Sequence, residues 1–305
     1  MVAPKPAMDD SGIGSVPAPR PACPQPRVRM ALSHSTLPEG VARLVFVHQG
    51  TTRLARLFQK APLRVLMPRP APGEPPCAVL LNTGGGIVGG DALQVAVRLE
   101  TGAAAVVTSQ AAEKAYRSAG PDATVDVGLG LGERTWLEWL PQETILFDGA
   151  RLRRTLRVDA APQARLLAAD MLVFGRRARG EQYRTGLLSD RWEVHVERRL
   201  VWADAVRLAP EPGPVLDAPF GFAGAGALAT CIYVASDAGD RIEFARELAE
   251  SSNVRSGATN MGPVLVVRWL GDDPAPVRQA LRRFCARFRH AVAGLPEQVP
   301  AIWRT

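Results

Sequence analysis

Several residue types and segments are scarce in this sequence, and each absence excludes a class of protein. The four cysteines lie far apart, form no C-x-x-C pair and have no histidine at metal-ligand spacing, which argues against a disulfide framework or a structural zinc site. No apolar run reaches the roughly 18 residues that cross a bilayer, and the N-terminus lacks the apolar core of a secretion signal. We therefore expect a cytoplasmic protein that makes no membrane contact.

Histidine is also sparse, and the familiar catalytic motifs are missing. His34, His48, His195 and His290 are spread over the whole chain, so a histidine-dependent active site is hard to assemble. The patterns G-x-S-x-G and H-E-x-x-H and the kinase signature set do not occur. The residues alone thus favour a scaffold over an enzyme.

Lysine and aromatic residues are few as well. With Lys5, Lys60 and Lys114 as the only lysines, the net charge of +7 comes almost wholly from arginine. A basic surface suits an anionic partner, but the arginines are scattered and aromatic residues make up only 6% of the chain. A nucleic-acid site would interleave basic and stacking side chains, so we expect no nucleic-acid partner.

The composition that is present predicts one folded domain behind a tail. Residues 1–29 are rich in proline and alanine and cannot bury enough apolar surface to fold, so this segment is predicted to be disordered. Hydrophobic residues make up 47% of the 305 residues, which is ample for a large core. Residues 30–305 are therefore assigned to a single β-rich domain.

Short segments of β-type patterning, separated by turn residues, fill most of this domain. Strands are expected at 41–49, 51–59, 62–68, 78–81, 93–99, 103–108, 124–131, 135–140, 151–158, 164–174, 191–202, 221–234 and 264–269. Helical patterning is confined to 240–250 and 276–291, while 109–118 fits either a short helix or a polar loop and 210–219 a loop. Short connections and about two helices predict a mainly β, antiparallel architecture.

The longer helical segment has one apolar and one basic face. The basic face carries Arg278, Arg282, Arg283 and Arg289. We interpret it as a solvated helix surface, with a partner-docking face as the alternative.

The segment around which the chain is organised is 78–91, AVLLNTGGGIVGGD. Its glycines Gly84, Gly86 and Gly89 match the spacing G-x-G-x-x-G, but a dinucleotide fold needs a helix after the third glycine. Residues 93–99 instead alternate with a period of two, which predicts a strand. The Walker phosphate motif also fails, because the loop has no Lys-Ser or Lys-Thr. A strand–turn–strand corner is the favoured interpretation.

One constellation in the sequence has metal-ligand chemistry. Glu193, His195 and Glu197 alternate along segment 191–202, so a strand would project all three from one face. Imidazole and carboxylate together suit a borderline divalent ion such as nickel. Alternating charge on a solvated strand explains the same residues and is favoured.

Five motifs, taken together, resemble the urease accessory protein D family, called UreD or UreH. They are NTGGGIVGGD at 82–91, TSQAAEKAYRS at 108–118, LPQETILFDGA at 140–150, GRRARGE at 175–181 and the closing PAIWRT at 300–305. The match covers about residues 40–305 in the family's order and spacing. No single glycine loop has this specificity.

The resemblance implies a non-enzymatic urease maturation protein with a β-rich, β-helix-like sandwich fold. Family members bind accessory protein F, which recruits the GTPase G, and dock the assembly onto apo-urease, as a dimer of heterotrimers. They pass nickel through an internal channel to the urease active site. Nickel is then a cargo in transit, and no tightly bound cofactor is expected.

Individual residues carry the family motifs. Gly84, Gly85, Gly86, Gly89, Gly90 and Asp91 match the first motif, Thr108, Gln110, Lys114, Tyr116 and Arg117 the second, Glu143, Phe147 and Asp148 the third, and Gly175, Arg176 and Glu181 the fourth. A cation in transit passes best along several weak oxygen ligands. Candidate nickel-path residues are therefore Asp91, Glu143, Asp148, Asp170 and Glu181, with Glu193, His195 and Glu197 as a weaker set.

Two alternatives to the nickel scaffold stay open at this point. An NAD-type enzyme built on the glycine loop would quench NADH fluorescence saturably. A basic RNA-binding β protein would show a steep salt dependence of its affinity. Neither alternative accounts for the other four motifs.

Overall fold

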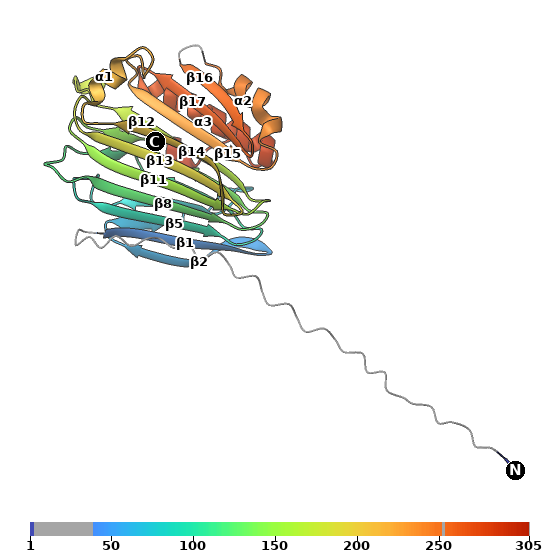
Figure 1. Cartoon of the computed structure of the whole chain (residues 1–305). Helices are drawn as coiled ribbons and strands as arrows, with labels where there is room; N and C mark the ends of the chain where they lie inside the picture. Colours follow the sequence, from blue (N-terminus) through green and yellow to red (C-terminus); the bar gives the residue numbers. More distant parts are fainter. Residues whose placement is uncertain (3–38, 252–253, 305) are drawn as a thin grey trace. The chain divides into compact units, whose positions relative to one another are not determined.

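The chain forms two β-sheets, and the two longer helices pack against one of them (Figure 1). The structure is a computed structural model and describes residues 1–2, 39–251 and 254–304; apart from Met1 and Val2, the predicted tail 1–29 lies outside the described residues. All helices and strands belong to one compact unit. The mainly β fold class is confirmed.

The first sheet has seven strands in the order β14-β13-β11-β8-β5-β1-β2 (Figure 1). Its strands are β1 (Glu39–Gln49), β2 (Thr51–Lys60), β5 (Ala92–Leu99), β8 (Ala123–Leu131), β11 (Arg151–Ala160), β13 (Leu187–Val196) and β14 (Arg199–Leu208).

The second sheet runs in the order β16-β17-β15-β12-β9-β6-β4-β3, and the short strands β7 and β10 continue it beside β12. Its strands are β3 (Leu63–Leu66), β4 (Cys77–Asn82), β6 (Ala104–Ser109), β7 (Glu113–Ala115), β9 (Trp136–Leu140), β10 (Thr144–Leu146), β12 (Arg165–Phe174), β15 (Ala227–Val234), β16 (Arg255–Met261) and β17 (Val264–Gly271).

The centre of the molecule is a parallel coil. From β4 to β13 the chain alternates between the two sheets, so each return to a sheet places a new strand beside the previous one in the same direction. Thus β5, β8, β11 and β13 pair in parallel in the first sheet, and β4, β6, β9 and β12 do so in the second. This is the geometry of a solenoid, in which each coil contacts its neighbours.

The predicted antiparallel pairing holds only towards the ends of the sheets. There β1 pairs with β2, β13 with β14, and β12 with β15 in antiparallel register. An antiparallel architecture would have each turn connect two neighbouring strands of the same sheet. Most of the turns between β4 and β13 instead lead from one sheet to the other. A parallel pair needs such a crossover, and the second sheet supplies it in place of a helix.

Two hydrophobic cores follow from this arrangement. The first lies between the sheets, where alternate residues of β5 (Leu93, Val95, Val97 and Leu99) are buried. The second lies between the ten-stranded sheet and the helices. Strand β9 serves both, because Trp139 belongs to the first core and Trp136 to the second.

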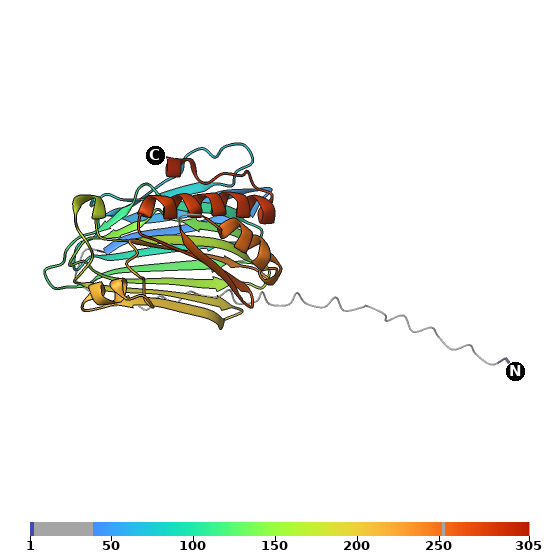
Figure 2. The same ribbon diagram turned by 90° about the horizontal axis from the view of Figure 1, so that it is seen from above.

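The helices α2 (Ile242–Ala249) and α3 (Pro274–Ala293) pack on the second sheet, and α3 lies across it (Figure 2). Asp273 caps α3 by accepting a hydrogen bond from the Ala275 N–H at 3.0 Å, and Gly294 ends the helix at φ 65°, the left-handed conformation that favours glycine. Burying Phe284 and Phe288 contributes roughly 1.5–3 kcal/mol per side chain.

Three predicted details differ in the structure. Arg289 is only 1% exposed, so it does not belong to a solvated face of α3. The segment 210–219 contains a short helix, α1 (Pro212–Asp217). The segment 109–118 holds the three-residue strand β7 in place of a helix or loop, because its backbone pairs with β10.

Segment 191–202 is a hairpin rather than one strand. β13 ends at Val196, a two-residue turn follows, and β14 begins at Arg199. Glu197 and Arg198 adopt φ values of 50° and 68°, as the turn of a two-residue hairpin requires. The reversal leaves Leu200 55% exposed, whereas a single strand would place it on the same face as the buried residues Trp192 and Val194.

Among the described residues, no helix has the length and apolar character needed to cross a membrane.

Candidate functional site

The four internal motifs lie on successive turns at one end of the coil. These turns, here called the stacked turns, are 83–91, 116–122, 147–150 and 175–186. Backbone hydrogen bonds join each to the next: Tyr116 N–H donates to Ile87 O, Ser118 N–H to Gly149 O, and Gly149 N–H to Thr185 O. Motifs separated in the sequence therefore form one continuous surface.

The glycines of the first motif are required by this stacking. A Cβ on Gly86 would collide with the Tyr116 ring and the Lys114 carbonyl, and one on Gly89 with Ser118. Gly86 also has a φ of 154°, which side chains rarely adopt. The predicted strand–turn–strand corner is confirmed, since β4 enters the loop and β5 leaves it.

An aromatic and arginine column crosses the stacked turns. The Tyr116 and Phe147 rings meet edge to face with centroids 4.9 Å apart, and the Arg176 guanidinium lies 4.0 Å from the Phe147 centroid. Arg176 also pairs with Glu181, whose Oε1 accepts from the Asp148 N–H at 3.1 Å. Residues of the second, third and fourth motifs are thus brought together.

Two of the predicted nickel-path residues hold the turns themselves. Asp91 accepts from the Val88 N–H at 2.9 Å. Asp148 accepts from the N–H groups of Arg184 and Thr185 at 3.0 and 2.8 Å, and from Arg117 at 2.8 Å. Partial burial raises the pKa of Asp148, but the hydrogen bonds from Thr185 and Arg184 outweigh it, so that the pKa lies below its ordinary value.

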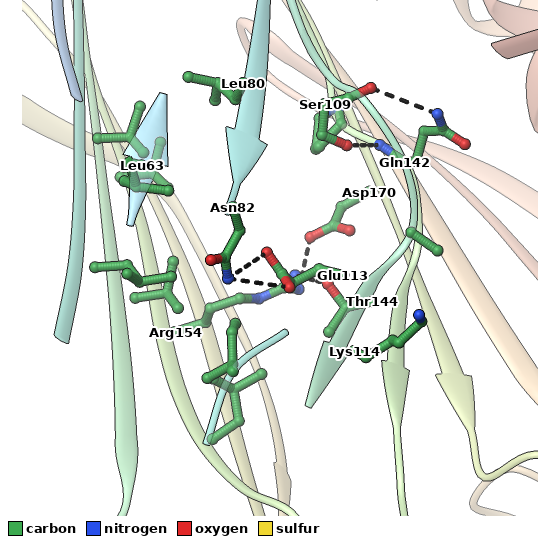
Figure 3. A pocket seen from close by; sticks show the side chains of 18 of the residues that line it. Leu63, Leu80, Asn82, Ser109, Glu113, Lys114, Gln142, Thr144, Arg154 and Asp170 are labelled. Atoms are coloured by element: carbon green, nitrogen blue, oxygen red, sulfur yellow. Dashed lines mark hydrogen bonds and ion pairs between the residues drawn. The ribbon is translucent and has the colours of Figure 1, made fainter. Parts of the chain in front are cut away.

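Behind the stacked turns, a cavity of about 260 Å³ lies between the two sheets (Figure 3). It extends to the places where the second sheet is interrupted, between β6 and β7 and between β9 and β10, while β12 runs past without a break. Gln110, Ala111 and Lys114 line the cavity and are exposed, so it opens to the surface there. Its walls combine an aliphatic lining with polar groups that include Asn82, Ser109, Gln142 and Thr144.

Three charged side chains meet inside this cavity. The Arg154 Nη2 lies 2.6 Å from Asp170 Oδ2 and 2.7 Å from Asp190 Oδ2, and these side chains are between 9% and 12% exposed. Burial raises the pKa of Asp170 to about 6, although the neighbouring Arg154 lowers it. Asp170 is the one predicted nickel-path residue that lines the cavity.

A fourth charge, Glu113, lies nearer the opening (Figure 3). The Asn82 amide donates to its two carboxylate oxygens at 3.3 and 3.2 Å, and burial raises its pKa. Glu113 therefore contacts a neutral partner, whereas Asp170 and Asp190 share a guanidinium.

The remaining predicted residues lie elsewhere. Glu143 is buried at the helix side, where it pairs with Arg278 of α3. Glu193 lies 3.9 Å from Arg157, and His195 lies 4.0 Å from Asp159, while Glu197 is in the hairpin turn. Over residues 39–251 and 254–304, no three His, Cys, Asp or Glu side chains are grouped so that they could hold a metal ion.

The closing motif reaches the second one. Trp303 Nε1 donates to Thr108 Oγ1 at 3.0 Å and to Leu140 O at 3.1 Å. Thr108, on β6, in turn donates to Leu140 O at 2.6 Å. All five motifs are therefore linked in space.

The sequence pattern missed Arg154, Asp190 and Glu113 as site residues. A signal for Arg154 was present, since it alternates with the buried residues Leu152 and Leu156 and must share their inward face. A buried arginine needs an anionic partner, which points to aspartates on the facing strands.

Comparisons with known proteins agree with the five motifs. The sequence model of the family described as UreD urease accessory protein matches residues 38–304. The urease accessory protein UreD of Magnetococcus marinus is 42% identical over 271 residues, which cover 87% of this chain and 93% of that relative.

Two further proteins of the same name are similarly close. That of Azorhizobium caulinodans is 43% identical over 254 residues, covering 83% of this chain and 91% of its own. That of Granulibacter bethesdensis is 42% identical over 240 residues, covering 78% and 99%. The chain therefore belongs to the UreD urease accessory protein family.

Proposed function

We propose that this chain is a non-catalytic scaffold in urease maturation, which carries nickel through its interior. It binds accessory protein F, through F the GTPase G, and apo-urease, in a cytoplasmic assembly that is a dimer of heterotrimers. Nickel is the cargo, and the chain holds no resident cofactor.

The observation that carries the proposal is the cavity between the sheets. It opens at the interruptions of the second sheet, beside Gln110 and Lys114 of the second motif, and it holds Glu113, Asp170 and Asp190 inside a wall that combines aliphatic and neutral polar side chains with Arg154. Oxygen ligands from carboxylates, amides and hydroxyls bind a borderline cation weakly when they are few and dispersed. Such a lining lets an ion pass instead of trapping it.

The contacts of the motif residues support the scaffold part of the proposal. Asp148 and Glu181 accept hydrogen bonds from the backbone of neighbouring turns, and Asp91 accepts one from the backbone of its own turn. These residues stabilise the wall and the end of the cavity. We therefore assign the nickel path to Glu113 and Asp170, with Asp190, and a supporting role to the acidic residues of the stacked turns.

The test is the nickel content of urease. Urease subunits and all accessory proteins are co-expressed with and without this chain, and nickel per urease active site is measured. We expect nickel occupancy to collapse without the chain while the urease subunits still assemble. Unchanged occupancy would refute the proposal.

A further inference from the structure

A single wall separates the main cavity from a second, smaller one. Arg154, Asp170, Asp190 and Trp192 line both cavities. The smaller cavity has about 10 Å³ of open volume, roughly what one water needs, and is also lined by Asp204 and Val206 of β14 and by Leu228 and Thr230 of β15. Anything that moves from the first cavity into the second must pass these side chains.

At this wall, two carboxylates converge on one atom. Asp170 Oδ2 and Asp190 Oδ2 both contact Arg154 Nη2, at 2.6 and 2.7 Å. On the same guanidinium, Nε donates to Asp190 Oδ1 at 3.0 Å. The Nη1 group donates to Thr144 Oγ1 at 3.0 Å (Figure 3). The position of Nη2 is thus a cation site whose present occupant is a side chain.

The dimensions suit a small divalent ion. Oxygen ligands bind such an ion at about 2.1 Å, so each carboxylate would have to close in by roughly half an ångström. The Thr144 hydroxyl accepts from Nη1, the neighbouring nitrogen of the same guanidinium, and the main cavity has room for water as further ligands. The Arg154 guanidinium carries one positive charge and faces the two negative charges of Asp170 and Asp190. A divalent ion at the same point would neutralise both.

The main cavity has enough open volume to accept the Arg154 side chain in a second position. Its guanidinium is held by the two aspartates and Thr144, while about 260 Å³ of open volume lies beside it. Displacement of the side chain would open the wall between the two cavities. Its return would expel the ion and close the wall again.

We propose that a divalent cation in transit takes the place of the Arg154 guanidinium between Asp170 and Asp190, so that Arg154 gates the passage between the two cavities. The inference rests on the proposed function and names the site and the residue that regulates it. Competition from a tethered cation keeps binding weak, as delivery requires.

The test measures binding of Ni²⁺ alone to the purified full chain by equilibrium dialysis, with nickel counted by atomic absorption. The Arg154→Met variant removes the competing cation and should bind Ni²⁺ at least tenfold more tightly than the unaltered chain. Adding Asp170→Asn to this variant should return binding to the original level. The matched control is Arg153→Met, an exposed arginine on the same strand that pairs with Asp122, and it should change nothing.

Equal nickel binding by the Arg154→Met variant and the unaltered chain would overturn the proposal. So would tight binding that survives Asp170→Asn, because the ion would then be bound elsewhere. If Arg154→Met does not fold, Arg154→Gln, which removes the charge but keeps an amide that can donate to the two aspartates, takes its place. It should still bind nickel more tightly than the unaltered chain, and equal binding overturns the proposal.

Different results refute the scaffold role and the Arg154 gate. Loss of nickel from urease in the absence of this chain, together with unchanged binding by Arg154→Met, refutes the gate and leaves the scaffold role. Full nickel occupancy without the chain refutes the scaffold role, whatever the dialysis shows.

Discussion

The acidic side chains of this protein have different hydrogen-bond partners, and these partners decide which carboxylates can bind an ion. Asp148 is held by backbone N–H groups of the adjoining turn, Asp170 by the Arg154 guanidinium at Oδ2 and by the Met171 N–H of its own strand at Oδ1, and Glu113 by an amide. An ion that displaces backbone donors must also break the turn. We therefore expect Asp148 to contribute to stability, and Asp170 and Glu113 to contribute to transport.

The first prediction concerns Asp148→Asn. At pH 7 the substitution should lower the free energy of unfolding by about 1–3 kcal/mol, because charge-assisted hydrogen bonds to the stacked turns are lost. The folded-state pKa of Asp148 lies below its ordinary value, so its contribution is present above about pH 4 and disappears as the pH falls through the folded pKa. The measurement is urea denaturation at several pH values.

Asp217→Asn is the control for this prediction. Asp217 pairs with Arg184 on the surface, and its side chain is 56% exposed, so the change should cost less than about 1 kcal/mol. An equal cost for both variants, or a cost for Asp148→Asn that does not decrease as the pH is lowered from about 4, would contradict the assignment.

The sequence predicts only in part which charged side chains are buried and what they contact. The alternation in β11 places Arg154 with Leu152 and Leu156, so its inward direction follows from the period of two. Its partners do not, because Asp170 and Asp190 reach it from other strands, and the pairing of those strands depends on the path of the whole coil.

At the scale of elements, α3 is fixed to the sheet by a buried ion network. Arg289 donates through Nε to Glu138 at 2.8 Å and through Nη2 to Glu74 at 2.6 Å. Its remaining donors reach the carbonyls of Pro296 and Gln298. Glu138 is fully buried on β9, so the network joins the helix, the sheet and the chain after the helix.

The second prediction follows from this network. Arg289→Met should lower the free energy of unfolding by about 3–5 kcal/mol, because Glu138 is left buried without a counterion. Adding Glu138→Gln removes that charge and should recover part of the loss. Arg283→Met, which changes an exposed residue of the same helix, should lie within about 0.5 kcal/mol of the unaltered chain. A cost below 1 kcal/mol for Arg289→Met would show that the network does not stabilise the fold.

The β13–β14 hairpin shows why a turn can escape sequence-based prediction. Glycine and asparagine usually mark two-residue turns with positive φ, but here Glu197 and Arg198 occupy those positions. The apolar alternation continues across the turn, so the pattern of 191–202 reads as one strand. When residues other than glycine or asparagine adopt a positive φ, the amino-acid composition of the segment does not reveal the turn.

The third prediction uses that strain. Arg198 has a φ of 68°, a conformation that costs a residue with a side chain about 1–2 kcal/mol. Arg198→Gly should therefore raise the melting temperature by a few degrees, in differential scanning calorimetry. Arg199→Gly, one residue later and in the strand, should lower it. A decrease for Arg198→Gly would mean that its side chain contributes more than the backbone strain costs.

At the scale of the whole molecule, the coil explains how distant motifs become one site. Each coil brings a turn to the same end, so the motifs stack there, and each coil adds one strand to either side of the cavity. The strand segments themselves follow well from local patterning. Their parallel order does not, because a short turn has the same composition whether it leads to a neighbour in one sheet or to the opposite sheet.

The last prediction tests the passage through the molecule. Val127 lies on β8 and lines the main cavity, so Val127→Phe should fill part of about 260 Å³ of open volume with little overpacking. Nickel per urease active site should then fall several-fold in the co-expression assay, while the chain still co-purifies with urease. Val88→Phe makes the same change at a 49% exposed position on the stacked turns and should leave nickel occupancy unaltered if this position is outside the path. Full occupancy with Val127→Phe would mean that nickel does not travel between the sheets, whereas a loss of co-purification would show that the cavity supports partner binding instead.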